Sequence, residues 1–179
     1  MKIKKPFNLN EWIEENRQFL KPPVGNKTIY DETSDDYIVM VVGGPNARKD
    51  YHYNETEELF YQLEGEITVF IQENGKKKAM KLSAGDMYLH PAKIPHSPAR
   101  TEGSIGLVIE RKRAGKGFTD GLLWYCDNCN HKLHEVYFEL HDIEKDFLPH
   151  FTEFFTSEEK RKCKQCGKVM ETNPKYTKL

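Results

Sequence analysis

The chain has 179 residues, which is enough for one domain with a sizeable core and a small additional segment. Lys and Arg number 27 and Asp and Glu number 28, so the net charge is −1, and no basic field argues for nucleic-acid binding. Aromatic residues make up 12% of the chain, a content typical of folded rather than disordered proteins.

Neither a membrane span nor an export signal is expected. No hydrophobic run approaches the length that crosses a bilayer. The N-terminal stretch MKIKKPFNLNEWIEE has lysines but no apolar core after them, so it does not fit a signal peptide. We therefore predict a cytoplasmic protein that does not bind membranes.

A short helix is predicted near the N-terminus, from Asn8 to Leu20. Asn10 is a candidate N-cap, and apolar residues such as Ile13 and Phe19 can form one buried stripe. The Lys21–Pro23 segment should end this helix, because proline lacks an N–H group and restricts the residue before it.

Short β-strands separated by turn residues dominate the next part of the chain. Asn74-Gly75, between two such runs, is typical of a tight hairpin. Many evenly spaced strands without intervening helices predict an all-β sandwich or small barrel. The predicted strands span residues 27–30, 37–42, 48–53, 58–63, 66–72, 76–82, 86–90 and 105–113.

The composition changes after residues 115–117. Two strands are predicted at 122–126 and 133–138, followed by a helix at 143–155 that is kinked or broken near Pro149. We predict a catalytic β-domain over residues 1–115. Residues 116–179 are predicted to be a cysteine-bearing appendage that packs on the same domain.

Three ligand-type residues lie in two separate stretches. His52 and Glu58 are six residues apart in DYHYNETEELFYQLEG, and His96 lies in GDMYLHPAKIPHSPAR. Two neutral imidazoles and one carboxylate are the set that non-haem Fe(II) oxygenases use, with coordination positions left open. The same set also suits manganese, zinc or nickel, so it predicts a metal site more firmly than it predicts iron.

The spacing of both stretches is similar to that of the two motifs of the cupin superfamily. That resemblance implies a jelly-roll barrel, also called a double-stranded β-helix. The first motif usually has a second histidine where this chain has Asn54, and the second usually ends in Asn where this chain has Arg100. The first departure reduces the protein ligands from four to three, which leaves room for a substrate and dioxygen together.

Three charged residues are candidates for the wall of the pocket. Arg48 and Arg100 each lie four residues from a ligand histidine, and two guanidinium groups can grip a carboxylate in bidentate fashion. The alternative is that they are ordinary surface arginines. Glu110 lies in the apolar run LVIER and is a candidate base if it faces inward, or a solvated charge if it faces outward.

All four cysteines lie in two Cys-x-x-Cys pairs, Cys126/Cys129 and Cys163/Cys166, separated by 33 residues. Four thiolates at this spacing predict a tetrahedral metal site, and in a reducing compartment this is favoured over disulfides. Spacing does not distinguish zinc from iron. We favour a structural role, in which the metal stabilises a segment with little core of its own, over electron transfer.

Several motifs together resemble the 3-hydroxyanthranilate 3,4-dioxygenase family, in its bacterial and fungal form with a second, rubredoxin-like metal site. The resemblance covers nearly the whole chain. It rests on KPPVGN (21–26), VVGGPNARKDYH (41–52), EELFYQLEG (57–65), HSPAR (96–100), LVIER (107–111) and WYCDNC (124–129).

The resemblance implies an Fe(II) enzyme that converts 3-hydroxyanthranilate and O₂ to 2-amino-3-carboxymuconate semialdehyde, in tryptophan and kynurenine degradation and in the supply of quinolinate for NAD. It implies a homodimer and iron, with zinc as the alternative, at the cysteine site. The alternative functions are a related dioxygenase of aminophenol or catechol carboxylates, and a metal- or ligand-binding cupin without turnover. The implied site residues are His52, Glu58 and His96 for the metal, and Arg48, Arg100, Glu110 and Asn26, with Glu58, around the substrate.

Overall fold

A computed structural model describes residues 5–22, 25–30, 34–46, 48–141 and 143–177. Three residues of the sequence motifs lie outside these ranges, namely residues 23 and 24 of KPPVGN and residue 47 of VVGGPNARKDYH. Residue 23 also belongs to the segment that was predicted to end the first helix. No helix among the described residues is long and apolar enough to cross a membrane.

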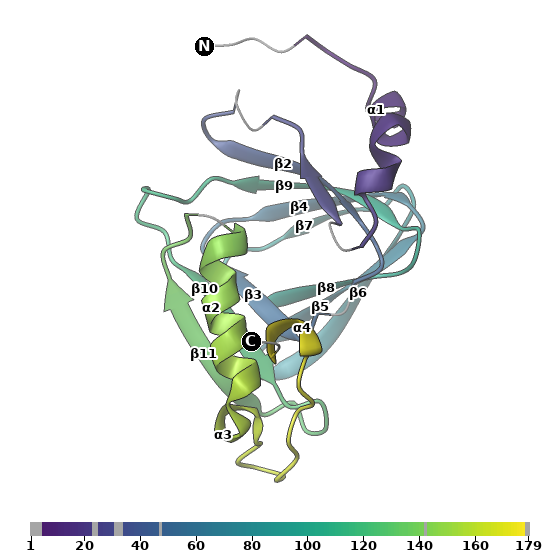
Figure 1. Ribbon diagram of the computed structural model, residues 1–179. Helices are drawn as coiled ribbons and strands as arrows, with labels where there is room; N and C mark the ends of the chain where they lie inside the picture. Colours follow the sequence, from purple (N-terminus) through teal and green to yellow (C-terminus); the bar gives the residue numbers. More distant parts are fainter. Residues whose placement is uncertain (1–4, 23–24, 31–33, 47, 142, 178–179) are drawn as a thin grey trace.

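Within the described ranges the chain forms two antiparallel sheets (Figure 1), which confirms the all-β prediction. The five-stranded sheet has the order β1 (Asn26–Thr28), β2 (Tyr37–Gly43), β9 (Ile105–Arg111), β4 (Glu58–Glu64) and β7 (Met87–His90). The six-stranded sheet has the order β11 (Lys132–Phe138), β10 (Asp120–Tyr125), β3 (Asp50–Asn54), β8 (His96–Arg100), β5 (Glu66–Glu73) and β6 (Lys76–Ser83).

The two sheets enclose an apolar core. Phe60 and Val108 come from the five-stranded sheet, and Ile67, Val69 and Leu82 come from the six-stranded sheet. These side chains are almost fully buried, which follows from the period-2 alternation of their strands. The inward face of each strand therefore points toward the interior in which the candidate ligands lie.

Strand β8 was not among the predicted strands. Its Pro98 argues against a central strand because proline cannot donate a hydrogen bond to a neighbour. The structure accommodates it because β3 and β8 pair only at His52 and His96, so β8 has already diverged from β3 at Pro98. Strand β8 pairs along its whole length with β5, from His96 opposite Ile71 to Arg100 opposite Ile67.

The N-terminal helix α1 (Leu9–Asn16) is shorter than predicted and continues as a 3₁₀ turn, Arg17–Phe19. The predicted N-cap, Asn10, is wrong. Asn8 caps the helix instead, since its side-chain oxygen accepts hydrogen bonds from the backbone N–H groups of Asn10 and Glu11. Ile13 packs with Val41 on the outer face of the five-stranded sheet, so α1 covers one end of that face.

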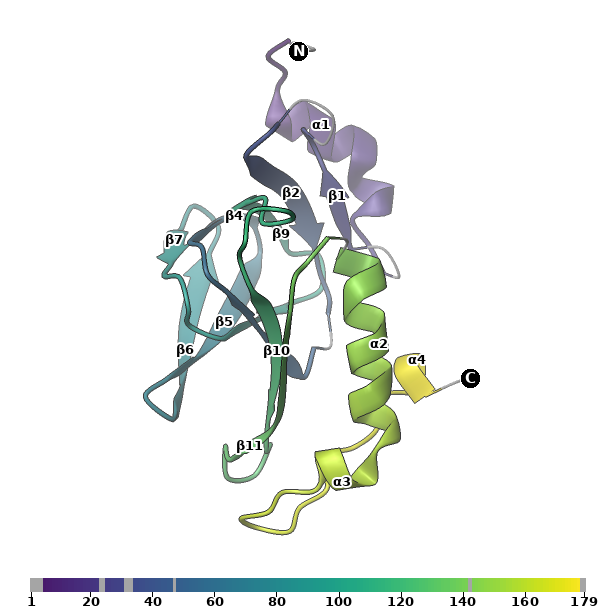
Figure 2. The same ribbon diagram turned by 90° about the vertical axis from the view of Figure 1, so that its left-hand side faces the viewer.

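The C-terminal helices are α2 (Ile143–Thr156), α3 (Glu158–Arg161) and α4 (Pro174–Thr177). Helix α2 continues through Pro149 and is not broken there. Figure 2 shows α2 running beside β10 and β11. Its Phe151 and Phe154 pack with Leu122 and Trp124 of β10.

Strand β10 pairs with β3, so residues on both sides of position 115 contribute to one sheet. The division into a domain at 1–115 and an appendage at 116–179 stays a prediction, but the second segment is not peripheral to the first. In the β3–β10 ladder Leu122 lies opposite His52 and Asp120 lies opposite Asn54, which places Asp120 on the same face as His52.

Candidate metal centre

His52, Glu58 and His96 converge in the interior between the sheets. They come from β3, β4 and β8, and His52 and His96 are directly opposite each other in the six-stranded sheet. Glu58 begins β4 in the other sheet and faces them across the interior. All three residues are buried, and their potential ligand atoms lie within 4.8 Å of one another. The structure thus brings together the three predicted ligands from three strands.

The charges of this cluster suit a cation. Glu58 Oε2 lies 3.1 Å from His96 Nε2. Burial alone would raise the pKa of Glu58, but the imidazoles of His96 and His52 outweigh it and lower the pKa to about 2. Burial also lowers the pKa of His52, which keeps this imidazole neutral and able to donate a lone pair. One carboxylate and two imidazoles are a donor set that fits a divalent transition metal.

A third buried histidine in the interior is not available as a ligand. His90 Nε2 donates to the Ile94 carbonyl oxygen at 2.8 Å, and its Nδ1 accepts from the Tyr88 hydroxyl at 3.2 Å. Burial lowers the pKa of His90 to about 4, so it is a neutral packing residue beside His96.

Asn54, at the position where a second histidine would stand, does not replace the missing ligand. Its side-chain amide donates toward Glu58 Oε2 at 3.4 Å, and its oxygen accepts from the Thr56 backbone N–H. Asn54 is buried, so these contacts satisfy a polar group that water cannot reach. It orients the ligand carboxylate while the cluster keeps three protein ligands.

A cavity of about 120 Å³ opens beside the three ligands. It joins a larger outer hollow of about 520 Å³ through shared wall residues, among them Asn26, Arg48 and Phe147. The inner wall is apolar at Phe60 and Val108. An apolar slot with a few charged groups is typical of a site for a small aromatic ligand. The cavity wall includes every predicted substrate-side residue, namely Asn26, Arg48, Glu58, Arg100 and Glu110.

Arg100 is buried and carries an unusual unsatisfied charge. Its side chain lines the cavity, and no carboxylate among the described residues forms an ion pair with it. Within those residues its Nη1 atom has no hydrogen-bond partner. Burial lowers the pKa of Arg100 to about 10, which still leaves it charged at neutral pH. A buried cation without a partner points to an anionic ligand in the cavity.

Gly106 leaves room for the side chain of Arg100 because it has no Cβ atom. A Cβ atom at Gly106 would meet Arg100 Nη1 at 3.0 Å and Gln62 Oε1 at 2.9 Å. The glycine in the run IGLVIER of β9 therefore lets the guanidinium of Arg100, which comes from the other sheet, approach the backbone of β9 closely.

Arg48 lies at the mouth of the cavity and precedes β3. Its guanidinium forms an ion pair with Asp50, and its side chain is 32% exposed. It lines both the inner cavity and the outer hollow, as does Asn26 at the start of β1. Of the two predicted arginines, Arg100 is therefore the inner one and Arg48 the outer one.

Glu110 faces inward, which decides between the two alternatives that the sequence left open. It is 4% exposed, and its carboxylate accepts from Arg113 Nη1 at 2.7 Å. Burial and the nearby charge of Glu58 raise the pKa of Glu110, Arg113 opposes both, and the net result is a pKa of about 7. A carboxyl group with a pKa near neutrality can both accept and return a proton.

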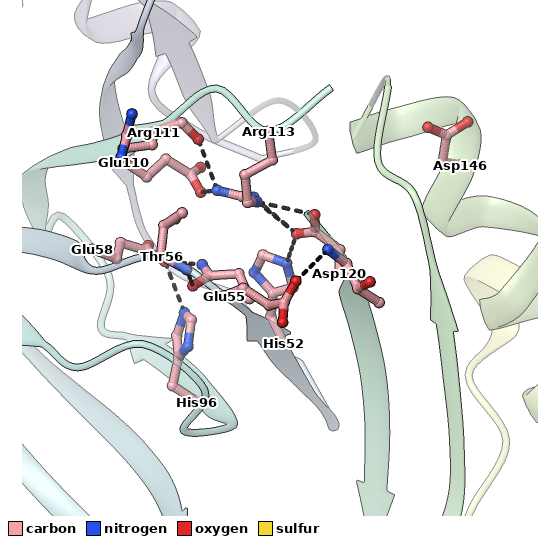
Figure 3. Close-up of polar contacts among 12 residues, drawn as sticks. His52, Glu55, Thr56, Glu58, His96, Glu110, Arg111, Arg113, Asp120 and Asp146 are labelled. Atoms are coloured by element: carbon pink, nitrogen blue, oxygen red, sulfur yellow. Dashed lines mark hydrogen bonds and ion pairs between the residues drawn. The ribbon is translucent and has the colours of Figure 1, made fainter. Parts of the chain in front are cut away.

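Sequence reasoning named neither Arg113 nor Asp120, although both contact predicted site residues (Figure 3). Arg113 lies just after β9 and donates to Glu110 and Asp120, and Asp120 lies 2.8 Å from His52 Nε2. Phe147 of α2 was also missed; its ring packs edge-on against His52 at 5.3 Å between centroids. The position of Arg113 two residues after LVIER was a weak signal, and we find none for Asp120.

The four cysteines form a second cluster. Their sulfur atoms lie within 4.8 Å of one another, and all four are free thiols. Asn130 and Gly167 follow the two pairs with positive φ angles of 59° and 78°, which allows a tight turn, called a knuckle, after each pair. Cys166 is exposed, and a backbone N–H bond from Lys168 lowers the pKa of its thiol to about 6. This donor set fits a tetrahedral metal ion.

Comparison with known proteins gives consistent matches. A family model described as 3-hydroxyanthranilic acid dioxygenase matches residues 1–155. A 3-hydroxyanthranilate 3,4-dioxygenase from Xanthomonas campestris pv. campestris (strain B100) is 51% identical over 174 residues, which is 97% of each chain. One from Bacillus thuringiensis (strain Al Hakam) is 45% identical over 165 residues, covering 92% of this chain and 90% of that protein.

Solved structures show a more distant likeness. A cupin-2 domain protein from Shewanella frigidimarina NCIMB 400 has a TM-score of 0.47 and 21% identity, covering 59% of this chain and 94% of that chain. A protein from Neisseria meningitidis has a TM-score of 0.48 and 16% identity, covering 60% of this chain and 100% of that chain.

Proposed function

Because the chain belongs to the 3-hydroxyanthranilic acid dioxygenase family and is a ring-cleaving dioxygenase, we propose that it binds 3-hydroxyanthranilate in the cavity beside an Fe(II) ion held by His52, Glu58 and His96. The proposed product is 2-amino-3-carboxymuconate semialdehyde, which places the enzyme in tryptophan and kynurenine degradation and in the supply of quinolinate for NAD. When bound, Fe(II) supplies a Lewis acid for the phenol and amine of the substrate and a site at which O₂ reacts.

The observation that carries this proposal is the buried guanidinium of Arg100. It lines the same cavity as the three ligands and lacks a carboxylate partner among the residues described. A benzoic acid carboxylate would fill that place with charge-assisted hydrogen bonds. Gripping the carboxylate there fixes the orientation of the ring relative to the metal, which is a positioning contribution to catalysis.

Glu110 is the proposed base. Its carboxylate lines the cavity on the five-stranded sheet, directly opposite Glu58 in the β4–β9 ladder. A group with a raised pKa near 7 is matched to accept the phenol proton at neutral pH and to return it later. Arg48, at the cavity mouth, is proposed to neutralise negative charge that develops on the reacting groups, and Asn26 to contact the substrate beside it.

The cysteine cluster is proposed to hold a second metal, iron as the family implies or zinc, in a structural role. It lies at the far end of β10 from Asp120 and joins two segments, since Cys126 follows β10 and Cys163 follows α3. Four thiolates complete a tetrahedron and leave no position for substrate. A thiolate site is stable where thiols stay reduced, which supports the proposed cytoplasmic location.

A homodimer is also proposed, with the outer face of the five-stranded sheet as its interface. An apolar row crosses four strands of this face, because each of its residues lies directly opposite the next in the neighbouring strand. From β2 to β7 the row is Val39, Ile109, Leu59 and Leu89. Leu89 and its neighbour Met87 are 54% and 64% exposed, and an exposed apolar row of this extent favours burial against a second copy.

Light scattering tests this interface. The wild-type protein should have twice the chain mass, and Leu89→Lys should have the monomer mass. A wild-type monomer would contradict this interface.

The function is tested with protein loaded anaerobically with Fe(II). We expect oxygen uptake in equal molar amount to 3-hydroxyanthranilate consumed, with a product band in the near ultraviolet. A preference for another aminophenol or catechol carboxylate would support the related-dioxygenase alternative. Substrate binding with no oxygen uptake in iron-loaded protein would support the non-catalytic alternative and contradict the proposal.

A further inference from the structure

Gln62 is a buried amide on the same strand as the ligand Glu58. It lies two residues after Phe60 and four after Glu58 in β4, so all three side chains point into the interior between the sheets. Gln62 is 0% exposed. A buried amide is expected to pair both its oxygen and its nitrogen, so an unpaired end needs an explanation.

One end of the Gln62 amide is paired and the other is not. The Nε2 group donates to the backbone carbonyl oxygen of Glu64 at 2.7 Å. A carbonyl oxygen can only accept, so this bond determines which end of the amide is the nitrogen and turns Oε1 the other way. Within the described residues, Gln62 Oε1 has no hydrogen-bond partner. A buried acceptor is therefore left facing away from the bulge at the end of β4.

This unpaired oxygen lies beside an unpaired donor. Gln62 is directly opposite Gly106 in the β4–β9 ladder (Figure 1). A Cβ atom at Gly106 would lie 2.9 Å from Gln62 Oε1 and 3.0 Å from Arg100 Nη1. Both atoms therefore border the same point, and neither has a partner among the residues that the structure describes. An acceptor and a donor are thus placed next to each other.

We propose that Gln62 positions the guanidinium of Arg100 and leaves its charge available for the substrate carboxylate. The inference rests on the proposed function, in which Arg100 grips that carboxylate. An amide oxygen accepts a hydrogen bond but carries no net charge, so it can orient a guanidinium without neutralising it. Arg100 lines the cavity and Gln62 does not, so Gln62 is expected to act through Arg100 and not by touching the substrate.

A second buried arginine has the opposite surroundings. Arg113 is 3% exposed and donates to two carboxylates, those of Glu110 and Asp120 (Figure 3). Its charge is compensated within the protein, and it does not line the cavity. Arg100 is 5% exposed and has an amide for a neighbour where Arg113 has acids. The neutral neighbour is what leaves the charge of Arg100 uncompensated until an anion enters the cavity.

A simpler explanation is that Gln62 only stabilises the irregular end of β4. Its side chain does donate across the bulge to Glu64, and its backbone pairs with Asp86 and Gly85. These contacts account for Nε2 and the main chain but not for a buried Oε1 beside Arg100. The two explanations differ in ligand preference, because a bulge contact affects folding and not the choice between ligands with and without a carboxylate.

Ligand binding without turnover tests the inference. The full chain loaded with Fe(II) is titrated in the absence of O₂, and calorimetry gives one Kd for 3-hydroxyanthranilate and one for 2-aminophenol, which lacks the carboxylate. Gln62→Glu places a carboxylate beside Arg100 that neutralises it. Binding of 3-hydroxyanthranilate should weaken by about tenfold or more, whereas binding of 2-aminophenol should change by less than about twofold.

Gln62→Met separates orientation from charge and covers the case in which Gln62→Glu does not fold. Methionine is similar in length, carries no charge and is only a weak acceptor. Arg100 then keeps its charge but loses the contact that orients it. Binding of 3-hydroxyanthranilate should weaken by about 3- to 10-fold, less than in Gln62→Glu, and binding of 2-aminophenol should again change by less than about twofold.

Gln72→Glu is the matched control. Gln72 is also a buried glutamine, but it lies on β5, and its amide exchanges hydrogen bonds with the side chain of Asn130. It does not line the cavity. The same substitution there should lower the melting temperature and leave the ratio of the two Kd values unchanged.

The outcomes separate this inference from the function on which it rests. Equal losses for both ligands, or no loss, in folded Gln62→Glu and Gln62→Met would overturn the role of Gln62 and leave the proposed function standing. Wild-type protein that binds neither ligand, or binds both equally well, would instead overturn the proposed grip of Arg100 and this inference with it.

Discussion

The two predicted metal sites of this chain differ in how they are built. The site in the barrel takes His52, Glu58 and His96 from three strands, and all three side chains are buried. The cysteine site takes its ligands from two knuckles, and Cys166 is exposed. The first set offers three donors beside a cavity, whereas the second offers four sulfurs, and Cys126 and Cys129 among them line a separate hollow of about 520 Å³.

This difference between the two ligand sets indicates which site is suited to catalysis. Three ligands leave positions for substrate and O₂, and Arg100 and Glu110 line the cavity beside that set but not the hollow beside the cysteines. Four thiolates saturate a tetrahedral ion, so we expect a metal there to contribute by holding chain segments together. Cys163 and Cys166 follow α2 and α3, and Phe147 of α2 packs against His52, so we expect the cysteine site to support the wall of the barrel site indirectly.

The largest effect is expected from the barrel ligands. His52→Ala or His96→Ala should remove iron from the barrel and reduce turnover to background, because two remaining donors hold Fe(II) weakly. Iron content per chain and oxygen uptake measure both results. His141→Ala, which removes an exposed histidine, is the control and should retain both. A fully active His52→Ala protein would contradict the ligand assignment.

The next largest effect is expected at Arg100. Arg100→Ala should raise the KM for 3-hydroxyanthranilate by the order of 100-fold, since truncating one partner of a buried charged pair costs about 2–5 kcal/mol. Binding of 2-aminophenol, which lacks the carboxylate, should change little. Steady-state kinetics with both compounds give the comparison. Equal losses for the two compounds would show that Arg100 does not grip the carboxylate.

A smaller and pH-dependent effect is expected at Glu110. The base works only when ionised, so kcat/KM should fall as the pH drops through the pKa of Glu110. Burial raises that pKa to about 7, and a bound divalent cation nearby should lower it, so the fall should lie at or below neutrality. Glu110→Gln should lose most of kcat, keep its iron and lose this acid limb. Retention of the limb in the variant would assign it to another group.

The smallest effect on turnover is expected at the cysteine site. Cys163→Ser should lower the melting temperature. In a chain of this size, each kcal/mol lost from the free energy of unfolding lowers it by about 2–4 °C. The aromatic core of α2 and β10, built on Trp124 and Phe154, should keep the segment folded at assay temperature. Initial kcat should then stay within about twofold of wild type. An immediate loss of activity in a folded variant would favour electron transfer or iron delivery.

The three candidate ligands could be predicted from the sequence because strand geometry is regular. Each motif spans only one or two strands, so the spacing of its residues along the chain determines which side chains face the interior. It could not decide the face of Glu110, since the alternation in LVIER fits either direction until the neighbouring strands are known. Strand β8 was missed because Pro98 is unfavourable in a ladder, and only the early divergence of β3 makes it possible. Asn10 was chosen as N-cap although Asn8 stood equally close.

The residues that sequence reasoning missed are those defined by long-range contacts. Asp120 meets His52 across 68 positions of the chain, and no local pattern marks such a pair. Phe147 lies in a helix rich in phenylalanine, where most of the rings form an ordinary core with β10. Pattern and spacing identify groups that bind the metal directly, but the groups that hold them in place emerge only from the fold.

A metal exchange between the two sites tests the central claim most directly. Protein with Zn(II) at the four cysteines and Fe(II) at His52, Glu58 and His96 should turn over 3-hydroxyanthranilate at the full rate. Protein with Fe(II) at the cysteines and Zn(II) in the barrel should be inactive. Activity that follows iron at the cysteines would contradict this account.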